Sequence, residues 1–566
     1  MHRRTYRSHE ITPEDIFLDS SNLPEFNRDQ MEGRIEKAIP RKYLIVLGVF
    51  FLAMGLFLSA RVFGLQIQDG EKYAKQSADN SLRHEVMFAA RGLVTDRNGA
   101  LLAWNEPNEI PDEFSWRRYV DADGFGNLLG FVKYPARDKS GFYYKKEITG
   151  ADGIESYFNT ILAGVNGLKI IEEDVRGRTQ SESTVRPAEE GKKLVLSIDA
   201  SVQKEFYNTL KQTVDTSGFT GGGGIIMDVH TGEVLSVVTY PEFNSAVMTD
   251  GKDADTIGAY FNDKRNPFLD RAISGLYAPG SIIKPFLAVA VLNEGIISPE
   301  KKILSTGSIT IANPYNPDLP SIFRDWKANG WTDVKEAIAV SSDVYFYAVG
   351  GGYEDQKGIG IAGIDRYAMM FGFGKPIDTP FFKVKNNGTV PSPEWKAKVF
   401  NSDPWRLGDT YNTSIGQFGF QVTAVQAVRA LSAMATGGTL VDPVIIKKDE
   451  EGYVEPKKET VSGVKPENYT IVKEGMRMAV TQGTLGALNF SDLHIAGKTG
   501  TAEVGSRKDY VNSWVTGFFP YENPKYAFAL VLEKGPSKYA EGAPASMKRV
   551  FEAMQAGTST ASYLTN

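Results

Sequence analysis

The 566-residue sequence contains no cysteine. This absence excludes disulfides, a thiolate nucleophile and cysteine-based zinc sites. The chain also has fewer basic than acidic residues, with 63 Lys and Arg and 69 Asp and Glu. Its basic residues do not gather into a continuous stripe. A nucleic-acid partner is therefore not expected. Hydrophobic residues make up 42% of the chain, which is enough for two or three ordinary domain cores.

Histidine is scarce. The five histidines are His2, His9, His84, His230 and His494. They show no metal-ligand spacing and no His-Glu-x-x-His helix. The glycine-rich residues 221–224 lack the Gly-Lys-Ser/Thr that would follow in a phosphate-binding loop. We expect neither a metal nor a cofactor.

One long apolar run is present near the N-terminus. Residues 43–60 are uncharged and almost wholly apolar, and the run continues past Arg61 to Leu65, which is long enough to span a bilayer. A buried core helix would show a polar face, and a cleaved signal peptide would end in an Ala-x-Ala-like site; neither is found. The sequence predicts a tail over 1–42 and a single transmembrane anchor over 43–65.

Charges beside this run predict its orientation. Four basic residues precede it: Arg34, Lys37, Arg41 and Lys42. Basic residues stay on the cytoplasmic side of a membrane helix. We therefore expect a single-pass protein of the cytoplasmic (inner) membrane, with a cytoplasmic N-terminus and the remaining chain outside.

The chain beyond the anchor divides into two regions with different sequence patterns. Residues 66–190 combine turn signals with short apolar segments, which predicts a small, mostly β module. Within it, Asn98-Gly99 lies between the apolar pairs 93–94 and 101–102, a strong hairpin signal. From residue 191 to 566, glycine-bordered strands alternate with helices, which predicts a second, α+β domain.

Four strands of this second domain can be predicted in pairs. Residues 224–228 and 233–238 flank a turn at Thr231-Gly232, and residues 513–519 and 526–532 form a second pair. A closing helix is expected over 546–555. Strands from both ends of the domain must then share one sheet.

Three short motifs in this domain carry the chemical signal. They are Ser281-x-x-Lys284, Ser341-Ser342-Asp343 and Lys498-Thr499-Gly500-Thr501. Together they are the parts of a site that attacks an amide through serine without histidine. The Ser-x-x-Lys pattern alone is weak, since it also occurs at Ser201, Ser298 and Ser462.

The surroundings of Ser281 distinguish it from the other matches. Pro279-Gly280 precedes it and a mostly apolar run over 282–292 follows, which predicts a buried helix that begins at a tight turn. One helical turn then places Lys284 on the same face as Ser281. The alternative is an N-cap serine with a lysine that reaches to solvent.

The motif segments resemble those of a known family. Residues 277–284, Tyr-Ala-Pro-Gly-Ser-Ile-Ile-Lys, resemble the nucleophile motif of the penicillin-binding proteins, and residues 91–99 resemble the entry segment of their class B members. Other segments match that family in order, at 150–155, 194–199, 227–228, 231–233 and 497–503. The resemblance covers roughly residues 65–555. Residues 341–347 resemble the penicillin-binding protein 2 branch, which acts in elongation.

This resemblance implies a fold. It is the penicilloyl-serine transpeptidase fold, an antiparallel sheet between helical layers, carried on a noncatalytic pedestal with one transmembrane helix. The stretch between Asn105 and Tyr119 is too short for the head subdomain that many class B members hold there, so a shortened pedestal is expected.

The resemblance also implies roles for the motif residues. Ser281 is the nucleophile, Lys284 its base, and Ser341 relays a proton from Lys284 to the leaving amine. Lys498 completes the catalytic set. The substrate-binding residues are Asp343, Thr499, Gly500 and Thr501, and Lys498, Thr499 and Thr501 hold the terminal carboxylate. Backbone N–H groups of Ser281 and Thr501 form the oxyanion hole.

Asp343 departs from the asparagine that most relatives have there. Lys284 accepts a proton only as a neutral amine, a form that burial and the charge of Lys498 favour. An ionised Asp343 beside it would oppose this role. We therefore expect Asp343 to point partly away from Lys284 or to be neutralised by Lys498, and an asparagine there to leave acylation within about tenfold.

The implied activity is that of a peptidoglycan D,D-transpeptidase. It would cross-link stem peptides, bind β-lactams as inhibitors and work beside a SEDS-family membrane glycosyltransferase. A septal transpeptidase, a D,D-carboxypeptidase and a β-lactam-binding sensor or noncatalytic scaffold stay open. A bifunctional synthase is excluded because the pedestal cannot also hold a glycosyltransferase domain.

Overall fold

The computed structural model describes residues 40–564 except 111–112, 174–177, 314–315, 317, 384–385 and 506–508; the side chains of 76–81 are also outside the description. Almost all of the predicted tail over 1–42 lies outside the described residues. The chain divides into two compact units, residues 1–84 with 170–182 and residues 85–169 with 183–566.

The first unit holds the predicted membrane helix. Helix α1 (Arg41–Phe63) continues as the π-helical turn η4 (Gly64–Gln68) and is followed by α2 (Gly70–Ser81). The continuous helix over Arg41–Gln68 is long and apolar enough to cross a membrane, and no residue of α1 is buried. Such an exposed apolar surface fits a single-pass anchor.

Short strands dominate the chain between α2 and residue 195. One sheet has the order β1-β9-β10 and another the order β11-β2-β3-β4. The strands are β1 (Leu82–Met87), β2 (Val94–Thr95), β3 (Leu101–Glu106), β4 (Trp116–Tyr119), β5 (Val132–Lys133), β6 (Ala136–Arg137), β7 (Tyr143–Lys145), β8 (Thr149–Gly150), β9 (Gly167–Glu173), β10 (Thr179–Arg186) and β11 (Leu194–Val195). Short helices join them: α3 (Gly126–Leu129), α4 (Gly153–Tyr157) and α5 (Asn159–Leu162).

Two predictions for this region are confirmed. Strands β2 and β3 pair as a hairpin around Asn98-Gly99, and Gly99 has the positive φ of +90° that such a turn needs. Strands β3 and β4 pair directly, with Glu106 opposite Trp116. The connection between them is therefore only residues 107–115, which leaves no room for a head subdomain.

A buried ion cluster fixes two of the segments that resemble the class B family. The Glu155 carboxylate accepts hydrogen bonds from Arg91 Nε at 2.5 Å and Arg117 Nε at 2.7 Å, and all three side chains are 1% exposed. Burial acts to raise the pKa of Glu155, but the two guanidinium groups outweigh it and lower that pKa. Residues 91–99 and 150–155 are thus joined by buried, charge-assisted hydrogen bonds.

The largest sheet of the second unit is the one predicted to combine strands from both ends of residues 191–566. Its five antiparallel strands have the order β13-β12-β22-β21-β20. Their bounds are β12 (Gly221–Asp228), β13 (Val234–Tyr240), β20 (Ala496–Val504), β21 (Tyr510–Phe519) and β22 (Tyr526–Pro536). Both predicted strand pairs are present, and the closing helix is α17 (Ala543–Ala556).

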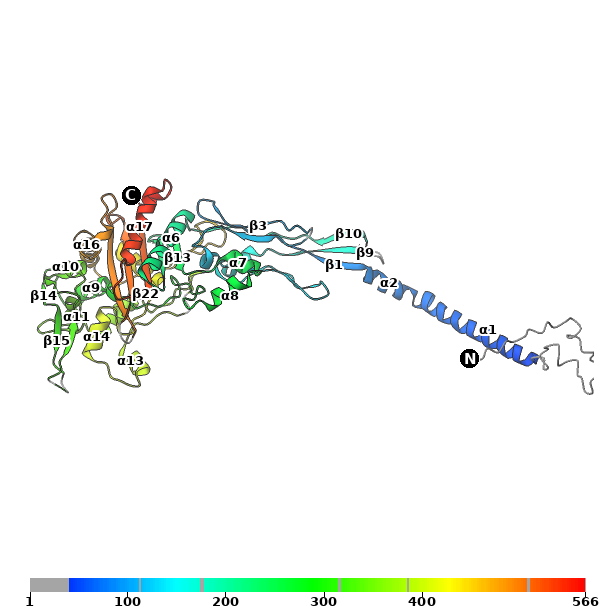
Figure 1. Ribbon diagram of the computed structural model, residues 1–566, viewed down its shortest axis with the longest axis horizontal. Helices are drawn as coiled ribbons and strands as arrows, with labels where there is room; N and C mark the ends of the chain where they lie inside the picture. Colours follow the sequence, from blue (N-terminus) through cyan, green and yellow to red (C-terminus); the bar gives the residue numbers. More distant parts are fainter. Residues whose placement is uncertain are drawn as a thin grey trace, which may run out of the picture. The chain divides into compact units, whose positions relative to one another are not determined.

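Helices cover both faces of this sheet (Figure 1). Alternate strand residues pack in opposite directions: Ile226, Phe528 and Leu530 join α6 (Ala200–Ser217) and α17 in one cluster. Ile225 and Ala529 join the opposite cluster with α9 (Lys284–Asn293) and α15 (Ala424–Thr436). The predicted fold, an antiparallel sheet between helical layers, is confirmed.

Further elements surround this core. The helices are α7 (Ser245–Asp250), α8 (Ala254–Asn262), α10 (Val334–Val340), α11 (Asp343–Gly351), α12 (Gly360–Met370), α13 (Pro393–Val399), α14 (Leu407–Ser414) and α16 (Pro466–Thr481), with 3-10 turns η5 (Gly280–Ile283), η6 (Gly486–Leu488) and η7 (Thr560–Tyr563). Three two-stranded sheets pair β14 (Ile303–Ser305) with β17 (Gly330–Thr332), β15 (Ser308–Ile311) with β16 (Ser321–Arg324), and β18 (Thr439–Val441) with β19 (Lys458–Thr460).

Glu242 makes the stability of the second unit depend on pH. Its carboxylate accepts hydrogen bonds from Gly124 N at 2.5 Å and Gly126 N at 2.8 Å. Burial nevertheless raises the pKa of Glu242 to about 7. A carboxyl group whose pKa is raised on folding contributes stability at low pH, and this contribution is lost as the pH rises from about 4.5 to about 7.

Replacing Glu242 with glutamine should remove this dependence. We expect the free energy of unfolding of Glu242→Gln, relative to that of the parent, to improve by about 1 to 2 kcal/mol between pH 4.5 and pH 7.5. Urea unfolding of both proteins at several pH values measures the difference. A difference that stays constant with pH would show that Glu242 does not titrate in this range.

Candidate active site

The first motif lies where a buried helix begins. Ser281 is in the turn η5, which leads directly into α9, and residues 284–292 of α9 are all buried. Gly280 has a φ of +54°, and a Cβ there would lie 2.7 Å from Thr501 O. The turn therefore requires glycine. The predicted start of a buried helix at Ser281 is confirmed.

The third motif lies on β20, the edge strand beside this turn. Gly500 is also required by close approach, because a Cβ there would lie 2.9 Å from both Pro279 O and Ile282 Cγ2. Across the sheet, Trp514 Nε1 donates a hydrogen bond to Ala278 O at 2.9 Å. The turn that carries Ser281 and the sheet edge are thus in direct contact and hold each other in place.

The second motif forms the turn between α10 and α11. Ser341 ends α10 in the left-handed conformation, with φ +58° and ψ 41°. Ser342 is the N-cap of α11, and its hydroxyl accepts a hydrogen bond from Tyr345 N. Asp343 is the first residue of α11.

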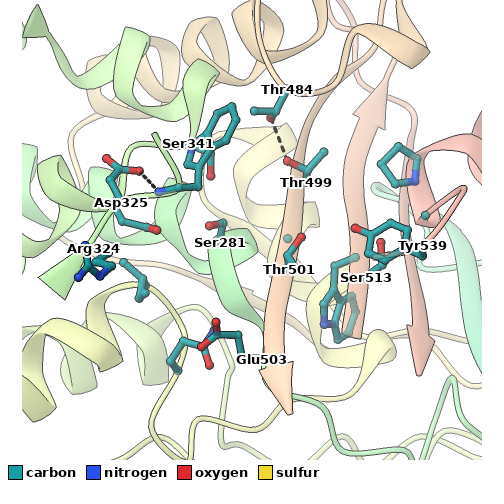
Figure 2. Close-up of a pocket in the computed structure, with 18 of the residues that line it drawn as sticks. Ser281, Arg324, Asp325, Ser341, Thr484, Thr499, Thr501, Glu503, Ser513 and Tyr539 are labelled. Carbon is teal, nitrogen blue, oxygen red and sulfur yellow. Dashed lines mark hydrogen bonds between the residues drawn. The ribbon is translucent and has the colours of Figure 1, made fainter. Parts of the chain in front are cut away.

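The three motifs meet at one cleft of about 1190 Å³. Six of the eight predicted site residues line it: Ser281, Ser341, Asp343, Thr499, Gly500 and Thr501. Figure 2 shows Ser281 between Ser341 on one side and the strand that carries Thr499 and Thr501 on the other. Lys284 and Lys498 are fully buried and are not among the described residues that line the cleft.

Lys284 contacts the second motif directly. Its Nζ donates hydrogen bonds to Ser341 O at 2.8 Å and, at the long distance of 3.4 Å, to Ser341 Oγ. Its shortest contact is with Asp343 Oδ1 at 2.5 Å. The expectation that Asp343 points partly away from Lys284 is therefore wrong. The side chain turns inward because a fully buried ammonium needs a carboxylate partner, and Asp343 at the start of α11 is within reach.

Burial and the three charges determine the pKa values of the site. Burial raises the pKa of Asp343, and the neighbouring Asp325 adds to this effect, while Lys284 and Lys498 oppose it. Burial lowers the pKa of Lys498 well below its usual value, and the positive charge of Lys284 lowers it further. Burial and the neighbouring charges thus shift the pKa of Asp343 upward and that of Lys498 downward.

Several cleft residues were not predicted from the sequence. Thr484 hydrogen-bonds Thr499 through their hydroxyls at 2.9 Å. Glu503 lines the cleft two residues beyond Thr501, a position that strand alternation could have revealed. Asp325 and Tyr539 come from distant segments and carry no local signal; Figure 2 shows both at the cleft.

The contact at Gly500 can be tested by adding one methyl group. We expect Gly500→Ala to lower the rate of serine acylation at least about tenfold, because the new Cβ pushes the turn that carries Ser281 away from β20. Gly258→Ala is the matched control, since nothing lies within 4 Å of a Cβ at Gly258 in α8. Unchanged acylation in Gly500→Ala would contradict the close contact.

Fold and site together define a serine acyl-transfer enzyme built like the penicillin-binding proteins. The family described as "Penicillin binding protein transpeptidase domain" matches residues 222–554, more than half of the chain. "Penicillin-binding Protein dimerisation domain" matches residues 112–196. The chain therefore belongs to the penicillin-binding protein family, as one of its class B members.

Comparison with individual relatives shows which class B members this chain resembles. The chain is 30% identical to peptidoglycan D,D-transpeptidase MrdA of Haemophilus influenzae over 522 residues, which cover 86% of this chain and 77% of the relative. Among solved structures, Pseudomonas aeruginosa PBP2 in complex with WCK 5153 is 26% identical, with a TM-score of 0.68 over 84% of this chain and 98% of that one. A chain of a peptidoglycan synthase complex is 24% identical, with a TM-score of 0.69 over 91% and 98%.

Proposed function

We propose that this chain is a peptidoglycan D,D-transpeptidase that works through an acyl-enzyme at Ser281. One observation carries the proposal: Ser281, Ser341 and Thr499–Thr501 line a single cleft above the buried pair of Lys284 and Asp343. The similarity to MrdA supports the same reaction. A noncatalytic scaffold would not need this arrangement.

The first step is attack of Ser281 Oγ on the carbonyl of the penultimate D-alanine. Lys284 must first be a neutral amine. Its proton would leave through the 2.5 Å contact with Asp343 Oδ1, a carboxylate whose pKa burial raises. Lys284 then accepts the proton of Ser281 as the ester bond forms.

The second step breaks the amide bond. Ser341 Oγ, which lies 3.4 Å from Lys284 Nζ, passes a proton to the nitrogen of the departing D-alanine. An amine from a neighbouring strand then attacks the ester, Ser281 recovers its proton, and the cross-link is complete. β-Lactams would form the same ester but without a leaving group that departs, so they would inhibit.

The substrate carboxylate would bind at β20. Thr499 and Thr501 offer hydroxyl groups to the cleft. Lys498 is buried and would attract the carboxylate by its charge. A carboxylate bound at Thr499 and Thr501 would raise the lowered pKa of Lys498, so that the lysine would be protonated when substrate is bound. The oxyanion hole of Ser281 and Thr501 backbone N–H groups remains part of the proposal.

The domain organisation and membrane orientation belong to the same proposal. We assign residues 1–42 to a cytoplasmic tail, 43–65 to the anchor, 66–190 to the pedestal and 191–566 to the transpeptidase domain outside the membrane. The family matches over 112–196 and 222–554 support the last two. Basic residues before the anchor support the orientation.

A SEDS-family glycosyltransferase is the proposed partner in elongation, and it would contact the exposed apolar face of α1. A photo-crosslinking residue at Phe57 or Leu65 should capture such a polymerase in the membrane. Capture of a division polymerase instead would favour the septal role, and capture of no polymerase would contradict the partnership.

The reaction is tested with the purified full chain in detergent and glycan strands that carry pentapeptide stems. Mass analysis of the digested product should show cross-linked dimers with loss of one D-alanine per cross-link. Tetrapeptides without dimers would identify a carboxypeptidase. No change in the strands, in a chain that still binds β-lactam, would identify a sensor or scaffold.

A further inference from the structure

Asp325 lies outside the three motifs but beside the second of them. It follows strand β16 and is 9% exposed, yet it lines the cleft that contains Ser281. Figure 2 shows it next to Ser341. A nearly buried carboxylate must be satisfied by several donors, so its contacts show which parts of the fold depend on it.

Two of these contacts are with the second motif. Asp325 Oδ2 accepts a hydrogen bond from Ser342 Oγ at 2.8 Å and another from Val344 N at 3.1 Å. Ser342 is the N-cap of α11 and Val344 is in its first turn. Asp325 therefore serves as a second capping acceptor for α11, supplied from another segment.

The other contacts fix Asp325 itself. Ser305 Oγ and Asn329 Nδ2 donate to the same Oδ2 atom, at 3.0 and 3.1 Å, and Trp326 N donates to Oδ1 at 2.9 Å. These residues belong to the β14–β17 region. The carboxylate thus joins this region, of which Trp326 lines the cleft, to the turn that carries Ser341 and Asp343.

That turn needs external support. Ser341 has a φ of +58°, a left-handed conformation that is unfavourable for a residue with a Cβ. Its hydroxyl lies 3.4 Å from Lys284 Nζ, at the outer limit of a hydrogen bond. A shift of a few tenths of an ångström would break this contact and disturb the Asp343 carboxylate two residues along the chain.

We propose that Asp325 is a positioning residue for acyl transfer, which holds the Ser341-Ser342-Asp343 turn against Lys284 through Ser342 Oγ and Val344 N. This inference rests on the proposed function of Ser281 and Lys284. Asp325 acts through the turn rather than on the substrate, so its loss should slow the chemical step and leave binding almost unchanged.

The test separates binding from acylation in the full chain in detergent. Stopped-flow measurement with a fluorescent penicillin gives the binding constant, the acylation rate constant and the final adduct titre. We expect Asp325→Asn to lower the acylation rate constant by about 10- to 100-fold, with binding changed less than about threefold and a full titre. An asparagine keeps the shape but replaces the charged acceptor with a neutral amide, which weakens the hydrogen bonds that Ser342 Oγ and Val344 N donate to one carboxylate oxygen.

Asp333→Asn is the matched control. Asp333 caps α10 by accepting from Lys335 N and Glu336 N, both at 2.9 Å, an N-cap role that asparagine also fills. It should acylate at the parent rate. The parent measured in parallel separates the two claims, because a parent without acylation contradicts the proposed function itself.

Ser342→Ala removes the donor of the hydrogen bond between Ser342 Oγ and Asp325 Oδ2. It tests the positioning role of Asp325 even if Asp325→Asn gives no folded protein. It should lower the acylation rate constant in the same way, and the double variant should be no slower than the slower single one. The inference is overturned if both folded variants acylate within about twofold of the parent. Equal losses in binding and acylation would also overturn it, as a general distortion of the cleft.

Discussion

Ser281→Ala is expected to reduce peptide cross-linking to background, a loss of at least about 10⁴-fold. The reason is chemical, because alanine has no oxygen with which to form the ester. Ser281 lies in the turn η5 at the base of the cleft, and alanine fits that turn without strain. The variant should therefore fold normally and still bind strands without turning them over.

The sequence offers a matched control for this loss. Ser201 has a lysine at the same spacing, Lys204, but it is exposed at the start of α6, far along the chain from the motifs. Ser201→Ala should cross-link at the parent rate. Residual cross-linking above about 1% in Ser281→Ala would mean that another group serves as the nucleophile.

Lys284→Met is expected to lower acylation by about 10³-fold, since the general base is lost. It should also destabilise the fold by about 3 kcal/mol, because the Asp343 carboxylate is left without its ammonium partner 2.5 Å away. With only 19% of its side chain exposed, water cannot fully replace that partner. Thermal unfolding and the acylation rate of the full chain measure the two effects independently.

The double variant Lys284→Met/Asp343→Asn separates these effects. Removing the orphaned carboxylate should recover most of the lost stability but none of the acylation. Asp343→Asn alone should keep acylation within about tenfold of the parent. The amide oxygen still accepts a hydrogen bond from Lys284, and it carries no negative charge that would stabilise the ammonium form of the lysine. Recovery of acylation in the double variant would show that Lys284 is not the base.

The nucleophile and the sheet could be predicted because their signals are local. Pro279-Gly280 before an apolar run specifies the turn and helix that carry Ser281, and short apolar runs bounded by turn residues specify strands β12, β13, β21 and β22. Neither inference requires knowledge of what packs against these elements.

The electrostatic arrangement could not be predicted in the same way. Asp343 lies 59 residues from Lys284, and only the packing of α11 beside α9 determines that the two side chains meet. Asp325 was missed because its partners Ser305 and Ser342 lie 20 and 17 residues away and form no pattern. Lys498 was expected to hold the substrate, yet it is fully buried. Desolvation of this kind has no signature in the sequence.

The central claim is that Ser281 becomes acylated, and intact mass spectrometry tests it most directly. The purified full chain is incubated with benzylpenicillin, and the adduct is located by peptide mapping, with Ser281→Ala alongside. We predict one stable equivalent on the parent, mapped to the peptide that contains Ser281, and none on the variant. A folded parent that gains no mass with two different β-lactams, or an adduct mapped to another residue, would contradict the account.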